Sequence, residues 1–142
     1  MNDLSALAGE WTVEIHRPET SAEPVRGRMS GELVLGGAPL EPCWLELRWT
    51  IDHPVFPDSV SLIGGADPAL YHWHYFDSRG VARTLRTSVS REAWTAVRED
   101  PDFWQRFTAR VDGDAITGAW ELSHDQGVSW QHDFDVTYTR VG

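Results

Sequence analysis

Short segments in which apolar and polar residues alternate follow one another along almost the whole chain. Alternation with a period of two is typical of β-strands that bury one face and expose the other. Turn-forming clusters such as DSRG, VDGD and HDQGVS separate several of these segments. About ten segments fit the pattern: WTVEI, RMSGELVL, CWLELRWTI, SVSLIGG, LYHWHYF, VARTLRTSV, EAWTAV, FWQRFTARV, AITGAWEL and WQHDFDVTYTR.

No stretch between these segments is long enough for the helix that usually connects two parallel strands. Only one short helix is predicted, over about residues 2 to 8. A chain with this pattern closes an antiparallel sheet into a barrel or folds into a sandwich. Its 142 residues are enough to bury one sizeable core but few for two domains. We therefore predict one all-β domain over residues 1–142.

Several stretches resemble known families. LAGEW, near the start, resembles the opening Gly-x-Trp of calycins, the lipocalin and fatty-acid-binding-protein group. HPVFPDSVSLIG, YFDSRGVAR, DFWQRF, ITGAWELS and WQHDFDVTYTR are similar, in this order, to an uncharacterised bacterial domain-of-unknown-function family with a lipocalin-like barrel. The resemblance implies an up-and-down calycin-like β-barrel of about eight to ten strands, with Trp11 as a plug. It supplies no catalytic residues, because the family has no established common activity. Calycins include carriers, haem proteins and some enzymes, so the fold alone does not decide the function.

Charge and cysteine content narrow the possible partners and the compartment. The net charge of −10 gives a surface that repels phosphate backbones, so nucleic acid is not an expected partner. No apolar run approaches the roughly 20 residues that cross a bilayer, and the start MNDLSALAGEW lacks a signal-peptide pattern. Cys43 is the single cysteine, which fits a reducing cytoplasm. We expect a cytoplasmic protein without membrane contact; its oligomeric state stays open.

The last predicted strand indicates which side chains face the barrel interior. Its alternate residues form one mostly aromatic face and one polar face, and the aromatic face must point inward. The inward set is Trp130, His132, Phe134, Val136 and Tyr138. By the same logic the preceding strand turns Ile116, Gly118, Trp120 and Leu122 inward.

The histidines of YHWHYF depend on the register of the following turn. A tight hairpin centred on Ser78 and Arg79 would place His74 opposite Arg83 and His72 opposite Leu85. Because the face of Leu85 is apolar, this register predicts that His72, His74 and Arg83 point inward. Tyr71, Trp73 and Tyr75 form an equally apolar alternative face, and a slip of one residue would reverse the assignment.

The pattern favours a barrel cavity that binds a small, largely apolar molecule carrying a polar or anionic group. Inward histidines and Arg83 would form a polar wall that orients this ligand, opposite an aromatic wall. The predicted ligand-binding residues are His72, His74, Arg83, Trp120, His132, Phe134 and Tyr138. DSRG is interpreted as turn chemistry only.

Three alternatives remain open from the sequence. The cavity could belong to an enzyme, an isomerase, cyclase or hydrolase in secondary metabolism, that uses histidine acid–base chemistry. The pair His72 and His74, with His132 or His124, could instead bind a metal ion, and one of these histidines could bind haem. A barrel with a filled core and a purely structural or protein-binding role is the third. Because no carboxylate has ligand spacing, we predict no metal and no cofactor; the lack of lysine also excludes a Schiff base with pyridoxal phosphate.

Overall fold

The computed structural model of the protein describes residues 3–17, 23–35, 44–67 and 69–142. Within these residues the chain forms one short 3-10 helix, η1 (Leu4–Leu7), and ten strands. The strands are β1 (Gly9–His16), β2 (Val25–Val34), β3 (Trp44–Ile51), β4 (Ser59–Gly64), β5 (Tyr71–Asp77), β6 (Ala82–Val89), β7 (Ala93–Glu99), β8 (Trp104–Asp112), β9 (Ala115–Ser123) and β10 (Gln131–Arg140). Cys43 lies outside the described residues. The described chain contains no helix with the length and apolar character needed to cross a membrane.

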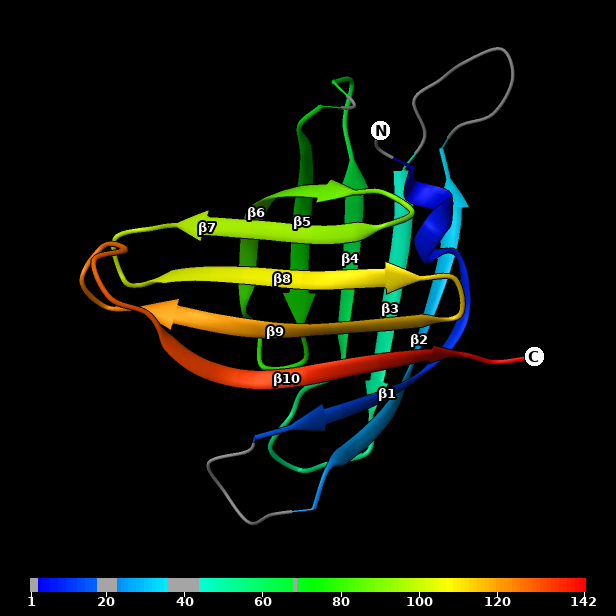
Figure 1. Ribbon diagram of the computed structural model, residues 1–142, viewed down its shortest axis with the longest axis horizontal. Coiled ribbons are helices and arrows are strands. Elements are labelled where there is room, and N and C mark those ends of the chain that lie inside the picture. The colour runs from blue at the N-terminus through cyan, green and yellow to red at the C-terminus, as the bar shows by residue number, and fades with distance from the viewer. Residues whose placement is uncertain (1–2, 18–22, 36–43, 68) are drawn as a thin grey trace.

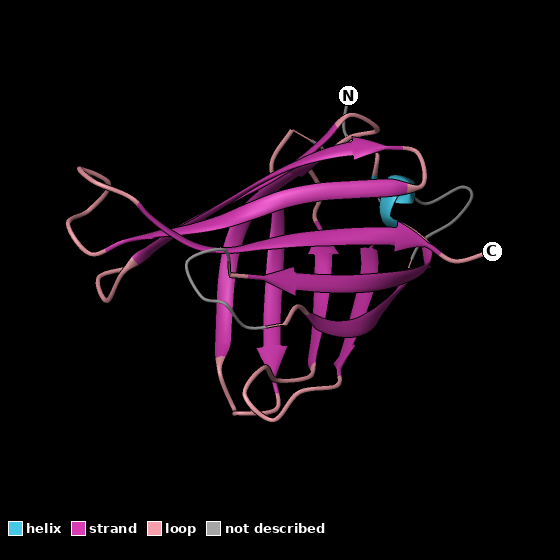
Figure 2. Ribbon diagram, turned by 60° about the horizontal axis from the view of Figure 1, so that its bottom comes forward, coloured by secondary structure: helices cyan, strands magenta, loops and turns pink. Residues whose placement is uncertain are grey.

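Each strand pairs antiparallel with its neighbours in the sequence, and β1 also pairs with β10, so the sheet closes into a barrel. This confirms the predicted all-β, antiparallel up-and-down barrel with a short N-terminal helix, here with ten strands. In Figure 1, β7 to β10 run across the view while β3 to β5 run down it, so the two sides of the barrel cross steeply. Figure 2 shows η1 set at one end of the strands.

Alternate residues of the strands point into the barrel, as the sequence pattern predicts; the burial of β1, for example, switches between exposed and buried at successive residues. Aromatic rings fill the middle of the barrel. Trp94 and Phe107 are almost completely buried and meet edge to face, with ring centroids 5.0 Å apart. Trp73 stacks on Trp94 at 5.0 Å, and Trp120 stacks on Phe107 at 4.8 Å. Burial of these rings removes a large apolar surface from water and so stabilises the barrel.

One end of the barrel is closed by η1 and by the side chain of Trp11. Trp11 is fully buried, and its Nε1 donates a hydrogen bond to the backbone oxygen of Leu7 at 3.1 Å. The guanidinium carbon of Arg140 lies 4.1 Å from the centre of the Trp11 ring. Gly31 lies against η1 so closely that a Cβ there would run into the Leu7 carbonyl oxygen. The structure therefore places Trp11 as the plug of this end.

The turn between β5 and β6 is one residue longer than predicted. The Asp77 N–H donates to the Val81 carbonyl at 3.0 Å, which leaves three residues in the loop. The last of them, Gly80, has φ of 86°, the left-handed conformation that three-residue hairpin loops require at this position. Tyr75 therefore lies opposite Arg83. A shift of one residue in register exchanges the two faces of a strand.

The inward direction predicted for His72 and His74 is consequently wrong. His72 is exposed and His74 lies on the same outer face of β5, while the intervening aromatic residues point inward. Arg83 does face the interior, because it pairs with an inward residue of β5. The face that lines the barrel is thus the alternative one, made by Tyr71, Trp73 and Tyr75.

A β-bulge at Asp133 changes the direction of the first residues of β10. His132 pairs with Glu121 and Phe134 pairs with Trp120, so Asp133 is the additional residue. The sequence pattern predicts that inward and outward residues alternate without interruption along β10. This prediction fails for the residues that precede the bulge. The inward direction predicted for His132 is therefore wrong: His132 is exposed, and Asp133 lines the interior.

The barrel wall is least continuous between β6 and β7. Their register runs only from Arg86–Val97 to Val89–Trp94, so within the described chain the first half of β6 is paired with β5 alone. This half lies at the end of the barrel opposite η1. The β3–β4 loop, the β5–β6 turn, the β7–β8 loop and the β9–β10 loop surround the same end, at the bottom and left of Figure 1. We call this end the mouth of the barrel.

Candidate functional site

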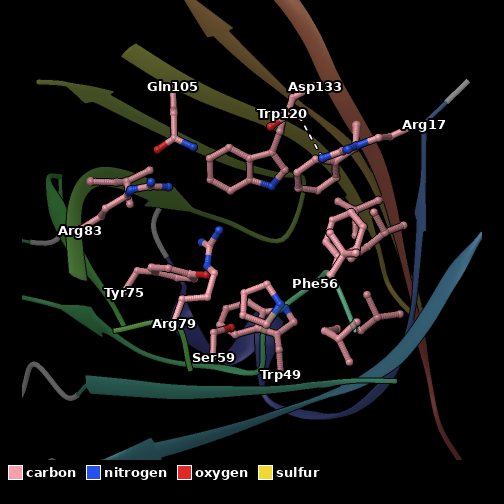
Figure 3. A pocket seen from close by; sticks show the side chains of 18 of the residues that line it. Arg17, Trp49, Phe56, Ser59, Tyr75, Arg79, Arg83, Gln105, Trp120 and Asp133 are labelled. Carbon is pink, nitrogen blue, oxygen red and sulfur yellow. Dashed lines mark ion pairs between the residues drawn. The ribbon is translucent and has the colours of Figure 1, made fainter. Parts of the chain in front are cut away.

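A cavity occupies the interior of the barrel next to the mouth (Figure 3). Its volume is about 300 Å³, at the lower end of the roughly 300–1,000 Å³ found for small-molecule sites. All strands except β2 and β7 contribute to its lining, together with the β3–β4 loop. The lining residues are Val13, Ile15, Arg17, Trp49, Ile51, Val55, Phe56, Pro57, Ser59, Trp73, Tyr75, Arg79, Arg83, Leu85, Gln105, Trp120, Asp133, Phe134, Val136 and Tyr138.

Aromatic rings form most of the inner wall of the cavity. Trp49 and Trp73 are nearly parallel, with centroids 6.1 Å apart, and Trp120 lies 5.7 Å from Trp73. Phe134 continues this wall toward the mouth, where Phe56 of the β3–β4 loop meets it edge to face at 6.0 Å. Rings arranged in this way favour an apolar, and particularly a flat, molecule.

Polar side chains gather at the mouth. Figure 3 shows Arg79, Arg83 and Gln105 on one side of the cavity and Arg17 on the other. Arg17 is paired with Asp133, with 3.6 Å between Nη2 and Oδ1. Among the described residues, the charged side chains that line the cavity are these three arginines and this one aspartate. The lining itself thus carries three positive side chains and one negative side chain, in a chain whose net charge is −10.

A network around Asp77 fixes Tyr75 and Arg79 at the rim. The buried carboxylate accepts a hydrogen bond from the Tyr75 hydroxyl at 2.8 Å and from Arg79 Nη2 at 2.6 Å. Burial alone would raise the pKa of Asp77, but the hydrogen bonds from Arg79, Tyr75 and two backbone N–H groups outweigh it and lower the pKa to about 2. Burial, and then the bond to Asp77, raise the pKa of Tyr75 to about 12. Tyr75 thus acts as a hydrogen-bond donor and is not suited to act as a base.

The Asp77 network predicts a loss of stability in acid. The folded-state pKa of about 2 lies below the ordinary aspartate pKa of 3.8, so this contribution is complete above about pH 4 and disappears as the pH falls toward 2. Urea unfolding at several pH values should show a steeper decline below pH 4 in the wild type than in Asp77→Asn. Asp112→Asn, which removes an exposed carboxylate of β8, should keep the wild-type slope. Equal slopes for the wild type and Asp77→Asn would contradict this role of Asp77.

Arg83 differs from the other two arginines at the mouth. Among the described residues no carboxylate forms an ion pair with it. Its guanidinium carbon lies 5.2 Å from the centre of the Phe103 ring, which also contacts Arg98 at 4.9 Å. Contact with a ring face leaves the N–H groups of a guanidinium available as donors. Arg83 therefore offers a positive charge and free donors to a molecule in the cavity.

The structure brings together part of the predicted ligand-binding set. Arg83, Trp120, Phe134 and Tyr138 all line the cavity, on β6, β9 and β10. The direction of these side chains is as the sequence predicted. Ligand binding by them stays a prediction, since it depends on a molecule and not only on position.

The three histidines of the predicted set lie elsewhere. The His74 ring contacts Trp44 on the outer surface at 6.0 Å, with the His72 ring 6.2 Å away. His132 Nε2 lies 2.8 Å from the Asp135 carboxylate. Among the described residues no histidine lines the cavity, and no group of three or more histidine, cysteine or acidic side chains is arranged to bind a metal ion.

Sequence reasoning missed Tyr75, Arg79 and Asp133. Tyr75 belonged to the alternative face of its strand, and the length of the turn decided between the two faces. Arg79 lies in the DSRG turn, whose residues Asp77 and Gly80 do have the predicted turn roles. A turn at the mouth can nevertheless direct one side chain into the cavity, and the sequence carries no signal for that direction.

Comparison with known proteins supports the fold and does not extend to a family. No family model matches the chain, and no curated protein matches it either. Among solved structures, the chain is similar to the crystal structure of Rv2717c from M. tuberculosis. The two share 12% sequence identity with a TM-score of 0.65, over 98% of this chain and 95% of that chain. At this identity the likeness shows a shared fold alone.

Proposed function

We propose that the protein binds a small, largely apolar molecule with an anionic group, holding the apolar part in the barrel cavity and the anion at the mouth. The aromatic inner wall and the arginines at the rim support the two halves of this proposal. Lipocalin-like binding of this kind uses a mostly apolar pocket with a few polar groups that orient the ligand.

The strongest support for the proposal is that Arg83 has no carboxylate partner among the described residues. The chain has 22 acidic and 12 basic residues, so most arginines have carboxylates near them. An arginine without such a partner in the described chain, on the wall of an aromatic cavity, has a charge and several donors left to satisfy. A carboxylate, sulfonate or phenolate satisfies both through charge-assisted hydrogen bonds.

The two alternatives that relied on histidine have less support. A cavity enzyme using histidine as acid or base, and a barrel that holds a metal or haem through histidine, each need an inward imidazole. The histidines lie outside the cavity, and Tyr75 is held protonated by burial and by its bond to Asp77. Binding needs only the aromatic and arginine side chains that line the cavity, whereas these two alternatives also need an inward histidine.

A pair of fluorescent probes tests the proposal. Anilinonaphthalene sulfonate carries an anion on an aromatic frame, and phenylnaphthylamine is its uncharged counterpart. We expect one equivalent of each to bind, with the tryptophans of the cavity quenched. Replacing Arg83→Gln should weaken the sulfonate about tenfold and change the affinity for phenylnaphthylamine by less than about twofold.

Arg110→Gln is the matched control, because it removes an exposed arginine of β8 that points away from the cavity. This variant should bind both probes as the wild type does. Equal weakening of the sulfonate in both variants would assign its binding to the general charge of the surface. The proposal would then be wrong, as it would be if neither probe bound to the folded protein.

The compartment and the partners belong to the same proposal. A single cysteine supports a cytoplasmic location. The acidic surface argues against nucleic acid as a partner, so the proposed partner is the small molecule in the cavity.

A further inference from the structure

The part of the cavity nearest its closed end contains a buried hydroxyl whose hydrogen-bonding capacity is half used. Tyr138 is 4% exposed and accepts a hydrogen bond from Trp49 Nε1 at 3.2 Å. Among the described residues, this is the one hydrogen bond of the Tyr138 side chain, and in it the oxygen is the acceptor. The O–H of Tyr138 therefore has no acceptor within the described protein.

A second buried donor without a partner belongs to a ring that neighbours Tyr138. The Trp94 ring is 6.0 Å from the Tyr138 ring, and Trp94 Nε1 is buried with no hydrogen-bond partner among the described residues. Buried donors without acceptors are uncommon, because burial removes the water that would otherwise accept from them. Trp94 is not among the residues that line the cavity, whereas Tyr138 is, so the Tyr138 hydroxyl is the donor to which a molecule in the cavity can supply an acceptor.

The chemistry of Tyr138 makes it a lasting donor. Burial raises the pKa of its hydroxyl well above the usual range, and the bond from Trp49 only partly opposes this effect. The hydroxyl thus keeps its proton at neutral pH. It can donate to a neutral oxygen and does not become an anion that would repel one.

We propose that the inner end of the cavity binds a carbonyl oxygen of the ligand, which accepts a hydrogen bond from the Tyr138 hydroxyl. This inference rests on the proposed function. With Arg83 at the mouth, it narrows the ligand class to flat apolar molecules with an anion at one end and a carbonyl at the other. An ordered water is the competing occupant, since a water could also accept from Tyr138.

Indanone and indane separate these possibilities, because they share a frame and differ by one carbonyl. Both are small and uncharged, so neither forms an ion pair with Arg83 at the mouth. Made in the otherwise wild-type protein, Tyr138→Phe should weaken indanone binding about three- to tenfold. It should change the affinity for indane by less than about twofold. The carbonyl stretching band of bound indanone should also shift to higher frequency in Tyr138→Phe, because it loses a donor.

The substitution also frees the indole N–H of Trp49, which could donate to indanone in place of Tyr138. The same comparison is therefore made in a Trp49→Phe background, where this N–H is absent. The loss of indanone affinity should persist between Trp49→Phe and the double variant. Affinity and carbonyl band unchanged by Tyr138→Phe in this background would overturn the inference and favour water at this position.

The outcomes also distinguish this inference from the proposed function. If anilinonaphthalene sulfonate binds while indanone does not, the carbonyl site is wrong and the anion site stands. The same conclusion follows if Tyr138→Phe weakens indanone and indane equally. If none of these molecules binds to the folded protein, both proposals fail.

Discussion

Replacing Phe107→Ala should lower the free energy of unfolding by about 3–5 kcal/mol. Phe107 is 1% exposed and lies between Trp94, Trp73 and Trp120, at the centre of the barrel. Its removal would leave a void among rigid rings that belong to three different strands, β5, β7 and β9. Such rings cannot close the gap without breaking the register of the barrel. Equilibrium unfolding in urea, followed by far-ultraviolet circular dichroism, measures the loss.

Phe134→Ala is the matched control for this prediction. The same side chain is removed, but Phe134 is half-buried and lines the open cavity. Less apolar surface is returned to water, and no new closed void forms, so the expected loss is about 1–2 kcal/mol. Equal losses for the two variants would show that the cavity beside Phe134 is filled and that the aromatic core extends to the mouth.

Trp11→Ala should also cost about 3–5 kcal/mol, for a different reason. Trp11 joins η1, β1 and the end of β10 through its bond to Leu7 and its contact with Arg140. Without the indole, η1 loses the surface on which it packs, and the closed end of the barrel opens to water. Thermal unfolding, with hydrogen exchange at the β1 and β10 amides, measures both effects.

Trp130→Ala provides the comparison for Trp11. Arg106 lies 4.1 Å from the Trp130 ring, the same distance as Arg140 from Trp11. Trp130 is only half-buried, next to the β9–β10 loop, so its replacement should cost much less. Comparable losses for Trp11→Ala and Trp130→Ala would mean that Trp11 stabilises the closed end through its arginine contact rather than through burial of its indole.

The barrel could be predicted because its signal is repeated in every strand. Alternation in ten segments leaves few ways to bury the apolar faces, and an error in one segment does not change the architecture. Leu85 and Val89 marked the inner face of β6 correctly for this reason. The direction of Phe134 and Tyr138 followed equally well from the aromatic face of β10.

The histidines were misplaced because their direction depends on single residues. One additional residue in the turn before β6, and one in the bulge of β10, each exchange inner and outer faces locally. Alternation alone cannot locate such residues, since the strand on either side remains regular. His72, His74 and His132 all fall on the wrong side of one of these two points.

The polar part of the site was only partly predictable. Arg83 lies within a regular strand, so its direction followed from its neighbours. Arg79 and Asp133 reach the cavity from a turn and a bulge, where the backbone leaves the regular pattern. The cavity itself depends on how rings from distant strands meet, which no local pattern of residues determines.

A crystal structure of the protein with anilinonaphthalene sulfonate would show whether the barrel cavity binds an apolar molecule with its anion at Arg83. We expect the naphthalene ring inside the barrel, against Trp73 and Trp120, with a sulfonate oxygen about 3 Å from an N–H donor of Arg83. The Arg17–Asp133 pair should remain at the opposite side of the mouth. The proposed function would be contradicted if the probe bound on the outer face, beside His72 and His74, and not in the cavity.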